Sequence, residues 1–265
     1  MTGFTFVEGG GPLVISMPHV GTALPDECAA AFNDLGRSVC DTDWHVDRLY
    51  DFAGAMGASL LAAKWSRWAI DLNRDPEGRA LYPGAFETSL CATRTFARQP
   101  IYQAGREPDA AEVARRLDAY WRPYHRQLAS ALAAAKRRHG FALLIDGHSI
   151  ASVCPSLFDG RLPDVNFGTN DGRSCAKAII AAAAGVTARQ DRFSWVVDGR
   201  FKGGWITRHY GRPAEGIHAF QIELTQSSYM DEADPRRFDP ERAQPMRELL
   251  QAIVEAALSA ARSVR

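Results

Sequence analysis

Polar groups follow four apolar runs that are predicted to be strands. They are His19 after LVISMP, Asn73 and Arg74 after AIDL, His148 in the run ALLIDGH, and Glu223 near the end of AFQIEL. In open α/β sheets, ligands bind beyond the carboxyl ends of the strands, so residues at several strand ends can share one site. The chain has only seven histidines, and two of them occupy such positions. These residues predict a single active site.

The two strand-end histidines, His19 and His148, are the candidate metal ligands. Imidazole and carboxylate donors suit Zn²⁺, and a catalytic zinc site has three protein ligands with one position open for water. The segment CDTDW offers two carboxylates for the third ligand; we favour Asp43, with Asp41 as the second choice or as a support for the ligands. The same donors suit other divalent transition metals. The alternative is that both histidines are hydrogen-bonded turn residues and that Asp41 caps a helix.

Four further residues extend the candidate site. Arg67, Asn73 and Arg74 can hold a carboxylate through paired, charge-assisted hydrogen bonds. The structural alternative is that Arg74 pairs with Asp71. Glu223 lies in a mostly apolar strand, where an ionised carboxylate is costly unless it has a partner or a task. It is therefore a candidate general base or a member of a buried ion pair.

The segment from Gly199 to Gly211 is rich in glycine and cationic side chains. Glycine permits close approach of the backbone to a ligand, so this segment is predicted to be a binding loop or flap over the site. A solvated hairpin tip is the alternative.

The composition limits the possible functions. With 265 residues, 46% of them hydrophobic, we expect one α/β domain over residues 1–265. The 31 basic and 31 acidic residues balance, so no nucleic acid or membrane partner is expected, only a small-molecule substrate. Five scattered cysteines without a CxxC pair, and no leader or membrane-spanning pattern, predict a cytoplasmic protein. The sequence leaves the oligomeric state open.

Apolar patterns predict the elements that position these residues. Strands are expected at residues 13–17, 58–63, 68–72, 141–145 and 217–224. Helical spacing is found at 42–56, 174–184 and 240–263, and from a cap at Asp109 through Arg138, with Pro123 kinking or dividing that helix. Residues 82–102 show no period and are predicted to be a long ordered loop. Strands alternating with helices favour a mixed, mostly parallel sheet flanked by helices.

The assembled motifs resemble the N-formylglutamate amidohydrolase family. The resemblance covers nearly the whole chain and is carried by SMPHVGTALP, DTDWHVDRLYDF, SRWAIDLNRDP, DGHSI, NFGTNDG, GRFKGGWITRHYG and HAFQIELTQSSYM. That family is related to the zinc carboxypeptidases and aspartoacylases, which implies their phosphorylase/hydrolase-like α/β fold. In those relatives, the counterparts of His148 and Glu223 are a metal ligand and the catalytic glutamate.

The resemblance implies zinc-dependent hydrolysis of N-formylglutamate, with Glu223 transferring protons and Arg67 stabilising the oxyanion. Asn73 and Arg74 would hold one substrate carboxylate. The second carboxylate would need another cation, for which the candidates are Arg94, Lys202 and Arg208. The chain departs from its zinc-enzyme relatives at one point. They supply two ligands as His-x-x-Glu, whereas His19 is followed by Val-Gly-Thr, so the acidic ligand must come from elsewhere, and we assign it to Asp43.

Two rival functions remain open. The run GHSIA after a strand is one glycine short of the nucleophile elbow G-x-S-x-G, so Ser149 could be a nucleophile with His209 or His218 as its base. That serine hydrolase would leave His19 without a role. The second rival is a non-catalytic carboxylate-binding module, for which the arginines and Asn73 would suffice.

Overall fold

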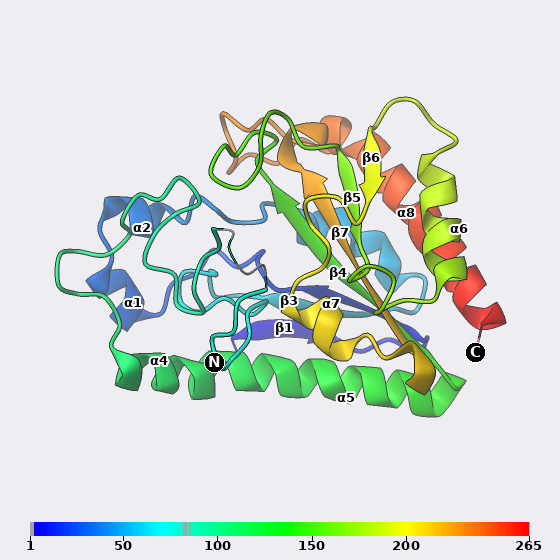
Figure 1. Cartoon of the computed structure of the whole chain (residues 1–265), viewed down its shortest axis with the longest axis horizontal. Helices are drawn as coiled ribbons and strands as arrows, with labels where there is room; N and C mark the ends of the chain where they lie inside the picture. Colours follow the sequence, from blue (N-terminus) through cyan, green and yellow to red (C-terminus); the bar gives the residue numbers. More distant parts are fainter. Residues whose placement is uncertain (1–2, 82–83, 85, 265) are drawn as a thin grey trace.

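A seven-stranded mixed sheet forms the framework of the molecule (Figure 1). The computed structural model describes residues 3–81, 84 and 86–264. In spatial order the strands are β1 (Phe4–Val7), β3 (Ser59–Ala63), β2 (Leu13–Met17), β4 (Ala142–Ile150), β7 (Ile217–Thr225), β5 (Val165–Gly168) and β6 (Trp195–Val197). The pairs β1–β3 and β5–β7 are antiparallel, and the other neighbouring pairs are parallel. The predicted mixed, mostly parallel sheet is confirmed.

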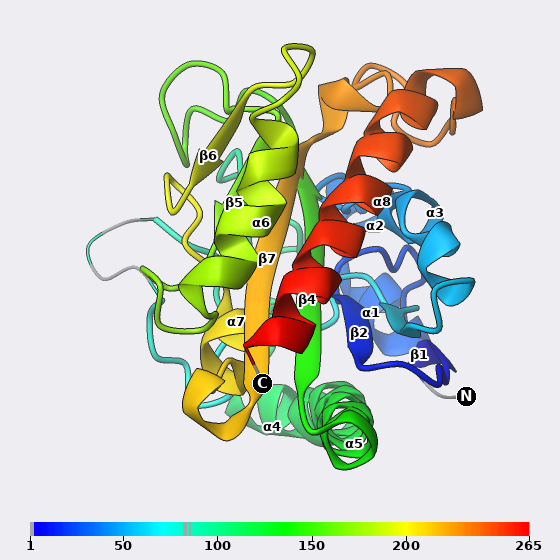
Figure 2. The same cartoon turned by 90° about the vertical axis from the view of Figure 1, so that its right-hand side faces the viewer.

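Helices cover both faces of this sheet (Figures 1 and 2). On one face α6 (Lys177–Thr187) packs against α8 (Pro240–Ser263), and on the other lie α5 (Arg122–His139) and α7 (Trp205–Tyr210). The shorter helices are α1 (Asp26–Ala31), α2 (Asp34–Ser38), α3 (Val46–Leu49) and α4 (Ala110–Arg116), with 3₁₀ turns at Asp51–Gly54, Pro213–Glu215 and Gln226–Ser228. No helix in the described residues is long and apolar enough to cross a membrane.

The central strands are buried on both faces, and their side chains alternate between two apolar cores. In β2, Leu13 packs in the core beneath α6 and α8, whereas its neighbour Val14 packs in the core beneath α5. On the α5 face, the apolar side chains give way to polar ones towards the carboxyl ends, at Ser16, Asp146 and Gln221. Polar side chains of three neighbouring strands therefore project from the α5 face at the carboxyl end of the sheet.

The long, strongly patterned elements match the sequence predictions. The strand Leu13–Met17 and the helix Pro240–Ser263 have the predicted bounds, and the strands predicted at 58–63, 141–145 and 217–224 and the helix at 174–184 are present with shifted ends. β4 continues five residues beyond the predicted end, to Ile150, so His148 lies within a strand and not in a turn after it. The strands β1, β5 and β6 were not predicted.

Two predicted elements were wrong. Residues 68–72 form turns and not a strand, with the Ala69 amide donating to the carbonyl of Ser66. Their apolar side chains are buried in a connection, and a short apolar run by itself does not distinguish a strand from a buried turn. The helical spacing at 42–56 gives only the short helix α3 and the 3₁₀ turn after it.

The predicted break at Pro123 is confirmed. Asp109 caps α4 by accepting the Glu112 amide at 2.8 Å, and a π-helical turn, Leu117–Trp121, separates α4 from α5. Proline has no N–H to donate to the preceding turn, which favours a wider turn at this point. In the predicted loop 82–102, residues 84 and 86–102 contain no helix or strand, and residues 82, 83 and 85 lie outside the described residues.

Candidate active site

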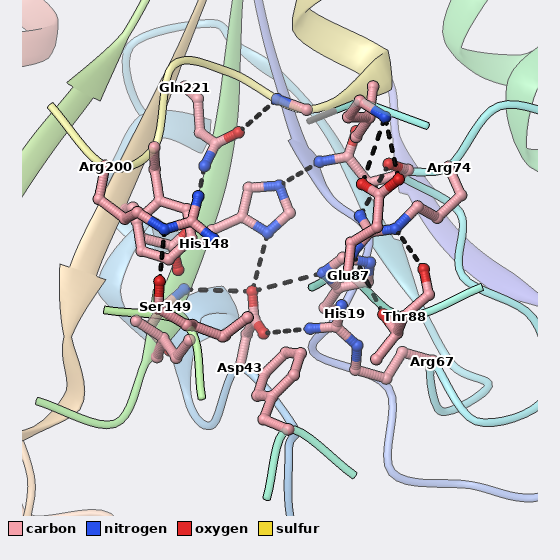
Figure 3. Close-up of a pocket in the computed structure, with 18 of the residues that line it drawn as sticks. His19, Asp43, Arg67, Arg74, Glu87, Thr88, His148, Ser149, Arg200 and Gln221 are labelled. Atoms are coloured by element: carbon pink, nitrogen blue, oxygen red, sulfur yellow. Dashed lines mark hydrogen bonds and ion pairs between the residues drawn. The ribbon is translucent and has the colours of Figure 1, made fainter. Parts of the chain in front are cut away.

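One pocket at the carboxyl end of the central strands brings together most of the predicted site (Figure 3). Seven predicted residues line it: His19, Asp43, Arg67, Asn73, Arg74, His148 and Glu223. They come from chain segments more than 200 residues apart, and only the parallel sheet brings them to the same end of the molecule.

The strand register explains how the polar side chains meet. β4 and β7 are paired with Asp146 opposite Gln221 and His148 opposite Glu223. Because side chains alternate along a strand, these four project from the same face. The shorter strand β2 ends at Met17 beside them, so the chain turns at Pro18 and brings His19 next to His148, with ring centroids 4.9 Å apart.

His19, Asp43 and His148 form a buried group whose candidate ligand atoms all lie within 4.8 Å of one another. Asp43 Oδ2 is 2.9 Å from Nδ1 of His148 and 3.8 Å from Nδ1 of His19. The Asp43 backbone amide donates to the carbonyl of His19 at 3.0 Å, which joins the turn before α3 to the end of β2. Both imidazoles therefore direct Nδ1 towards the same carboxylate.

Carboxylates also contact Nε2 of each imidazole ring, the nitrogen directed away from Asp43. His19 Nε2 donates to Asp71 at 2.7 Å, and His148 Nε2 lies 3.1 Å from Asp146. Asn73 donates to the same Asp146 oxygen at 3.0 Å and accepts from the Ile206 amide. Hydrogen bonds of this kind fix the ring orientation and the tautomer of metal-ligating histidines.

The electrostatics of the group reflect the surrounding carboxylates. Burial disfavours a charged His148, but Asp146 and Asp43 outweigh burial and raise the pKa of this imidazole well above its usual range. Burial, aided by Arg67, lowers the pKa of His19. The carboxyl of Asp71 is also buried, but Arg74, His19 and Arg67 hold its pKa well below its usual range.

These residues fit a divalent metal ion. Within the described part of the chain, Nδ1 of His19 is buried without a hydrogen-bond partner, which is costly for a polar atom unless a ligand is bound there. The group offers two imidazoles and one carboxylate, the donor set of a catalytic zinc site. Buried carboxylates also outnumber the buried arginines around this pocket, where Asp43, Asp71 and Asp146 are buried together with Arg67. A cation would balance that excess of negative charge.

The two side chains predicted to be catalytic, Arg67 and Glu223, lie on either side of His19, Asp43 and His148. Arg67 donates to Asp71 at 2.8 Å, lies 3.6 Å from Asp43, and stacks its guanidinium over the ring of Phe96. On the other side, Glu223 accepts a hydrogen bond from Gln221 at 2.8 Å. Burial raises the pKa of the Glu223 carboxyl to about 8, with His148 acting in the opposite direction.

Arg74 lines the pocket, and its guanidinium is anchored by Thr88, which lines the same pocket. Its Nε donates to the Thr88 carbonyl at 2.9 Å and its Nη2 to the Thr88 hydroxyl at 3.1 Å, while Nη1 lies 3.8 Å from Asp71. The backbone of this turn is held by Trp121, in the π-helical turn before α5, which donates to the Arg74 carbonyl, and by His125 in α5, which donates to the Leu72 carbonyl.

The three other predicted cations do not line the pocket. Arg94 donates to the Arg98 carbonyl, Lys202 pairs with the exposed Asp171 at 2.8 Å, and Arg208 donates to the carbonyls of Gly203 and Leu81. The predicted binding loop 199–211 is divided, since its second half contains helix α7 and its first half brings Arg200 to the pocket.

A family model for N-formylglutamate amidohydrolase matches residues 11–230. The chain belongs to the N-formylglutamate amidohydrolase family. N-formylglutamate deformylases from Pseudomonas aeruginosa and Pseudomonas putida are 47% and 46% identical to it over 255 residues, covering 96% of this chain and 96% and 95% of theirs. The structure of an N-formylglutamate amidohydrolase from Ralstonia eutropha superposes with a TM-score of 0.81 at 29% identity, covering 100% of this chain and 99% of the other. A 19% identical protein from Agrobacterium tumefaciens shares the fold, with a TM-score of 0.67 and 96% of each chain covered.

The geometry of this N-formylglutamate amidohydrolase family member does not assemble a serine nucleophile. Ser149 Oγ is buried at 2.7 Å from the Tyr229 hydroxyl and 3.4 Å from Gln226. Of its two proposed bases, His209 stacks on Trp205, and His218 accepts the Ala176 amide. The Ser149 amide instead donates to Asp43 at 3.1 Å. This serine therefore supports the carboxylate of the metal-type group, by which we mean His19, Asp43 and His148.

Asp146, Gln221 and Arg200 were not singled out from the sequence, although each holds a site residue or lines the pocket of this family member. Asp146 and Gln221 hold His148 and Glu223, and Arg200 forms part of the wall. The sequence does contain a pattern that indicates Asp146 and Gln221. In DGH and QIE, polar residues alternate with other residues within otherwise apolar strands, so the two polar side chains of each run face the same side. Arg200 had only its place in a glycine-rich segment.

Proposed function

We propose that this chain is an N-formylglutamate deformylase, which hydrolyses N-formyl-L-glutamate to formate and L-glutamate as the last step of a histidine-degradation route. The observation that carries the proposal is the buried group His19, Asp43 and His148 in one pocket with Glu223. The 47% identity to a curated deformylase over 96% of the chain supports the choice of substrate. The proposal treats residues 1–265 as one amidohydrolase domain, located in the cytoplasm.

In this proposal His19, Asp43 and His148 hold the metal, and zinc is the ion that best suits two imidazoles with one carboxylate. When bound, such an ion supplies Lewis acidity that makes water a nucleophile near neutral pH and polarises a carbonyl. Asp71 and Asp146 keep the two rings oriented towards it.

Glu223 carries the proton in the proposed reaction. A cation held by His19, Asp43 and His148 would favour the ionised form of the Glu223 carboxyl. The carboxylate then accepts a proton from the attacking water as the water oxygen bonds to the formyl carbon. It then delivers this proton to the substrate nitrogen as the carbon–nitrogen bond breaks, which releases formate and the free amine of glutamate. The hydrogen bond from Gln221 holds the carboxylate in place between these two transfers.

Two arginines stabilise negative charge, one on the reacting formyl oxygen and one on a substrate carboxylate. Arg67, fixed between Asp71 and the Phe96 ring, stabilises the oxyanion that develops on the formyl oxygen. Arg74, supported by the turn that contains Asn73, binds the α-carboxylate beside the scissile bond. Fixed donors of this kind stabilise a transition state without reorganising during the reaction.

The test couples metal analysis of the purified protein to formate release from N-formylglutamate. We expect about one metal ion per chain, as in single-metal catalytic sites, and loss of activity with a chelator but not with a serine-directed phosphonate. Full turnover after complete metal removal would refute the proposed site. Tight binding of N-formylglutamate without turnover in the metal-loaded protein would instead support a carboxylate-binding module.

A further inference from the structure

The pocket contains a second arginine that approaches from a different element than Arg74. Figure 3 shows Arg74 and Arg200 on opposite sides of the pocket, with His148 and Asp43 between them. Arg74 belongs to the turns between β3 and α4, and Arg200 to the segment between β6 and α7. Two guanidinium groups therefore face one cavity from separate supports.

The side chain of Arg200 is held in position within the protein. Its Nε donates to the carbonyl of Leu157 at 2.5 Å, and its guanidinium lies 5.2 Å from the centre of the Phe201 ring. A hydrogen bond donated by Nε, combined with a cation–π contact, restricts the rotation of an arginine and directs its planar fork.

The segment that carries Arg200 is anchored at both ends. At the start, the Asp198 amide donates to the Phe167 carbonyl and the Asp198 carboxylate accepts the Thr169 amide, both at 2.7 Å. At the end, the Gly204 amide donates to Gln221 at 2.7 Å, and a Cβ at Gly204 would overlap the Asn73 side chain. A binding group on such a support loses little conformational freedom when a ligand arrives.

The surroundings of Arg200 match the distal half of an acidic amino acid. Ile150, Leu157 and Phe201 line the pocket with it and present apolar surface. Arg74 instead lies 3.8 Å from Asp71, the carboxylate that accepts from Nε2 of the candidate ligand His19. A substrate whose amide carbon reacts at the metal-type group would have its α-carboxylate near Arg74. Its two methylene groups would then extend along apolar surface towards the opposite wall.

We propose that Arg200 binds the side-chain carboxylate of the substrate and so selects a dicarboxylic N-acyl amino acid. This inference rests on the proposed deformylase function. It assigns to Arg200 the role that the sequence had given to Arg94, Lys202 or Arg208, none of which lines the pocket.

The test compares two substrates that differ only in the distal group, N-formylglutamate and N-formylglutamine. The wild-type enzyme should prefer N-formylglutamate, and Arg200→Ala should reduce the ratio of the two kcat/KM values about tenfold to hundredfold, the scale of a charged hydrogen bond. Arg200→Lys should retain part of the preference, because it keeps the charge but not the fork. Arg173→Ala, which removes an exposed arginine outside the pocket, is the matched control and should leave the ratio unchanged.

The outcomes separate the two proposals. If wild-type protein loaded with metal releases no formate from N-formylglutamate, the deformylase function fails, and the assignment of Arg200 fails with it. If the wild type is active but Arg200→Ala keeps the full substrate preference at normal metal content, only the assignment of Arg200 is overturned. Equal loss of activity on both substrates would also overturn this assignment, because it would indicate that Arg200 has a structural role.

Discussion

Asp71 accepts a hydrogen bond from Nε2 of His19 at 2.7 Å, while Nδ1 of the same ring faces Asp43. This buried carboxylate also accepts from Arg67 and from the backbone amide of Asn73. One side chain therefore orients a metal-type histidine, the arginine proposed to stabilise the oxyanion, and the turn that carries Arg74. Asp71 lies in a segment that was predicted to be a strand. It contacts more residues than the ion pair with Arg74 that the sequence suggested.

Asp71→Asn should weaken metal binding by about tenfold to hundredfold, the usual effect of losing a carboxylate behind a ligating histidine. The variant keeps the size of the side chain but cannot orient both His19 and Arg67 as a carboxylate does. Metal affinity measured by competition with a chelator would check this. Asp75→Asn, four residues further on and outside the pocket, is the control and should bind metal normally. Unchanged affinity in Asp71→Asn would show that His19 does not need this partner.

Asp43→Asn should lose both metal and activity, as should His19→Ala and His148→Ala, because each change removes one of three candidate ligands. Asp41→Asn should retain the metal, since the Asp41 carboxylate accepts the Phe96 amide at 2.6 Å and lies outside the ligand group. Metal content after gel filtration distinguishes the two aspartates. A greater loss of metal in Asp41→Asn than in Asp43→Asn would reverse the assignment.

Glu223→Gln should keep the metal and lose about two to four decades of kcat, the typical cost of removing a general base. The amide is close in size to the carboxylate, and its oxygen can still accept the hydrogen bond from Gln221, so the fold should persist. Formate release and metal content should be measured on the same preparation. Loss of the ion in this variant would instead make Glu223 a ligand and cast doubt on Asp43.

Arg74→Lys should reduce kcat/KM for N-formylglutamate about tenfold to hundredfold, because lysine cannot offer two parallel donors to a carboxylate. The effect should vanish for an analogue whose α-carboxylate is an amide. This comparison probes the opposite end of the substrate from the Arg200 test. A variant that still discriminates as well as the wild type would make Arg74 structural, held by Thr88 and Asp71.

His125 predicts a pH dependence of stability. Burial lowers the pKa of this imidazole to about 3, from an ordinary value of 6.5. Below pH 6.5 the unfolded chain therefore binds a proton that the folded chain does not. The free energy of unfolding should fall towards low pH, with a contribution from His125 of about 1.4 kcal/mol per pH unit between the two values.

The experiment compares metal-free wild type with His125→Gln in urea unfolding at several pH values below 6.5. Glutamine can still donate to the Leu72 carbonyl but does not titrate. The wild-type curve should fall more steeply with decreasing pH than the curve of the variant. Parallel curves would mean that His125 becomes protonated without unfolding.

The sequence by itself determined the long elements and the chemical types at the site. Leu13–Met17 and Pro240–Ser263 could be placed from apolar patterns alone, because continuous burial and helical amphipathicity leave periods that survive in the sequence. His19 and His148 could be grouped because both follow apolar runs predicted to be strands, and Asp43 was added because the segment CDTDW offers carboxylates for a third ligand.

The tertiary structure alone decided which polar side chains share the pocket. Asp146 joins the site because β4 continues past the predicted end and stays in register with β7, and the register depends on pairing between residues 75 positions apart. Arg200 reaches the pocket, whereas Lys202 faces Asp171, because anchors at Asp198 and Gly204 fix the path of the segment between them. Such contacts are formed between elements distant in sequence, so no local pattern encodes them.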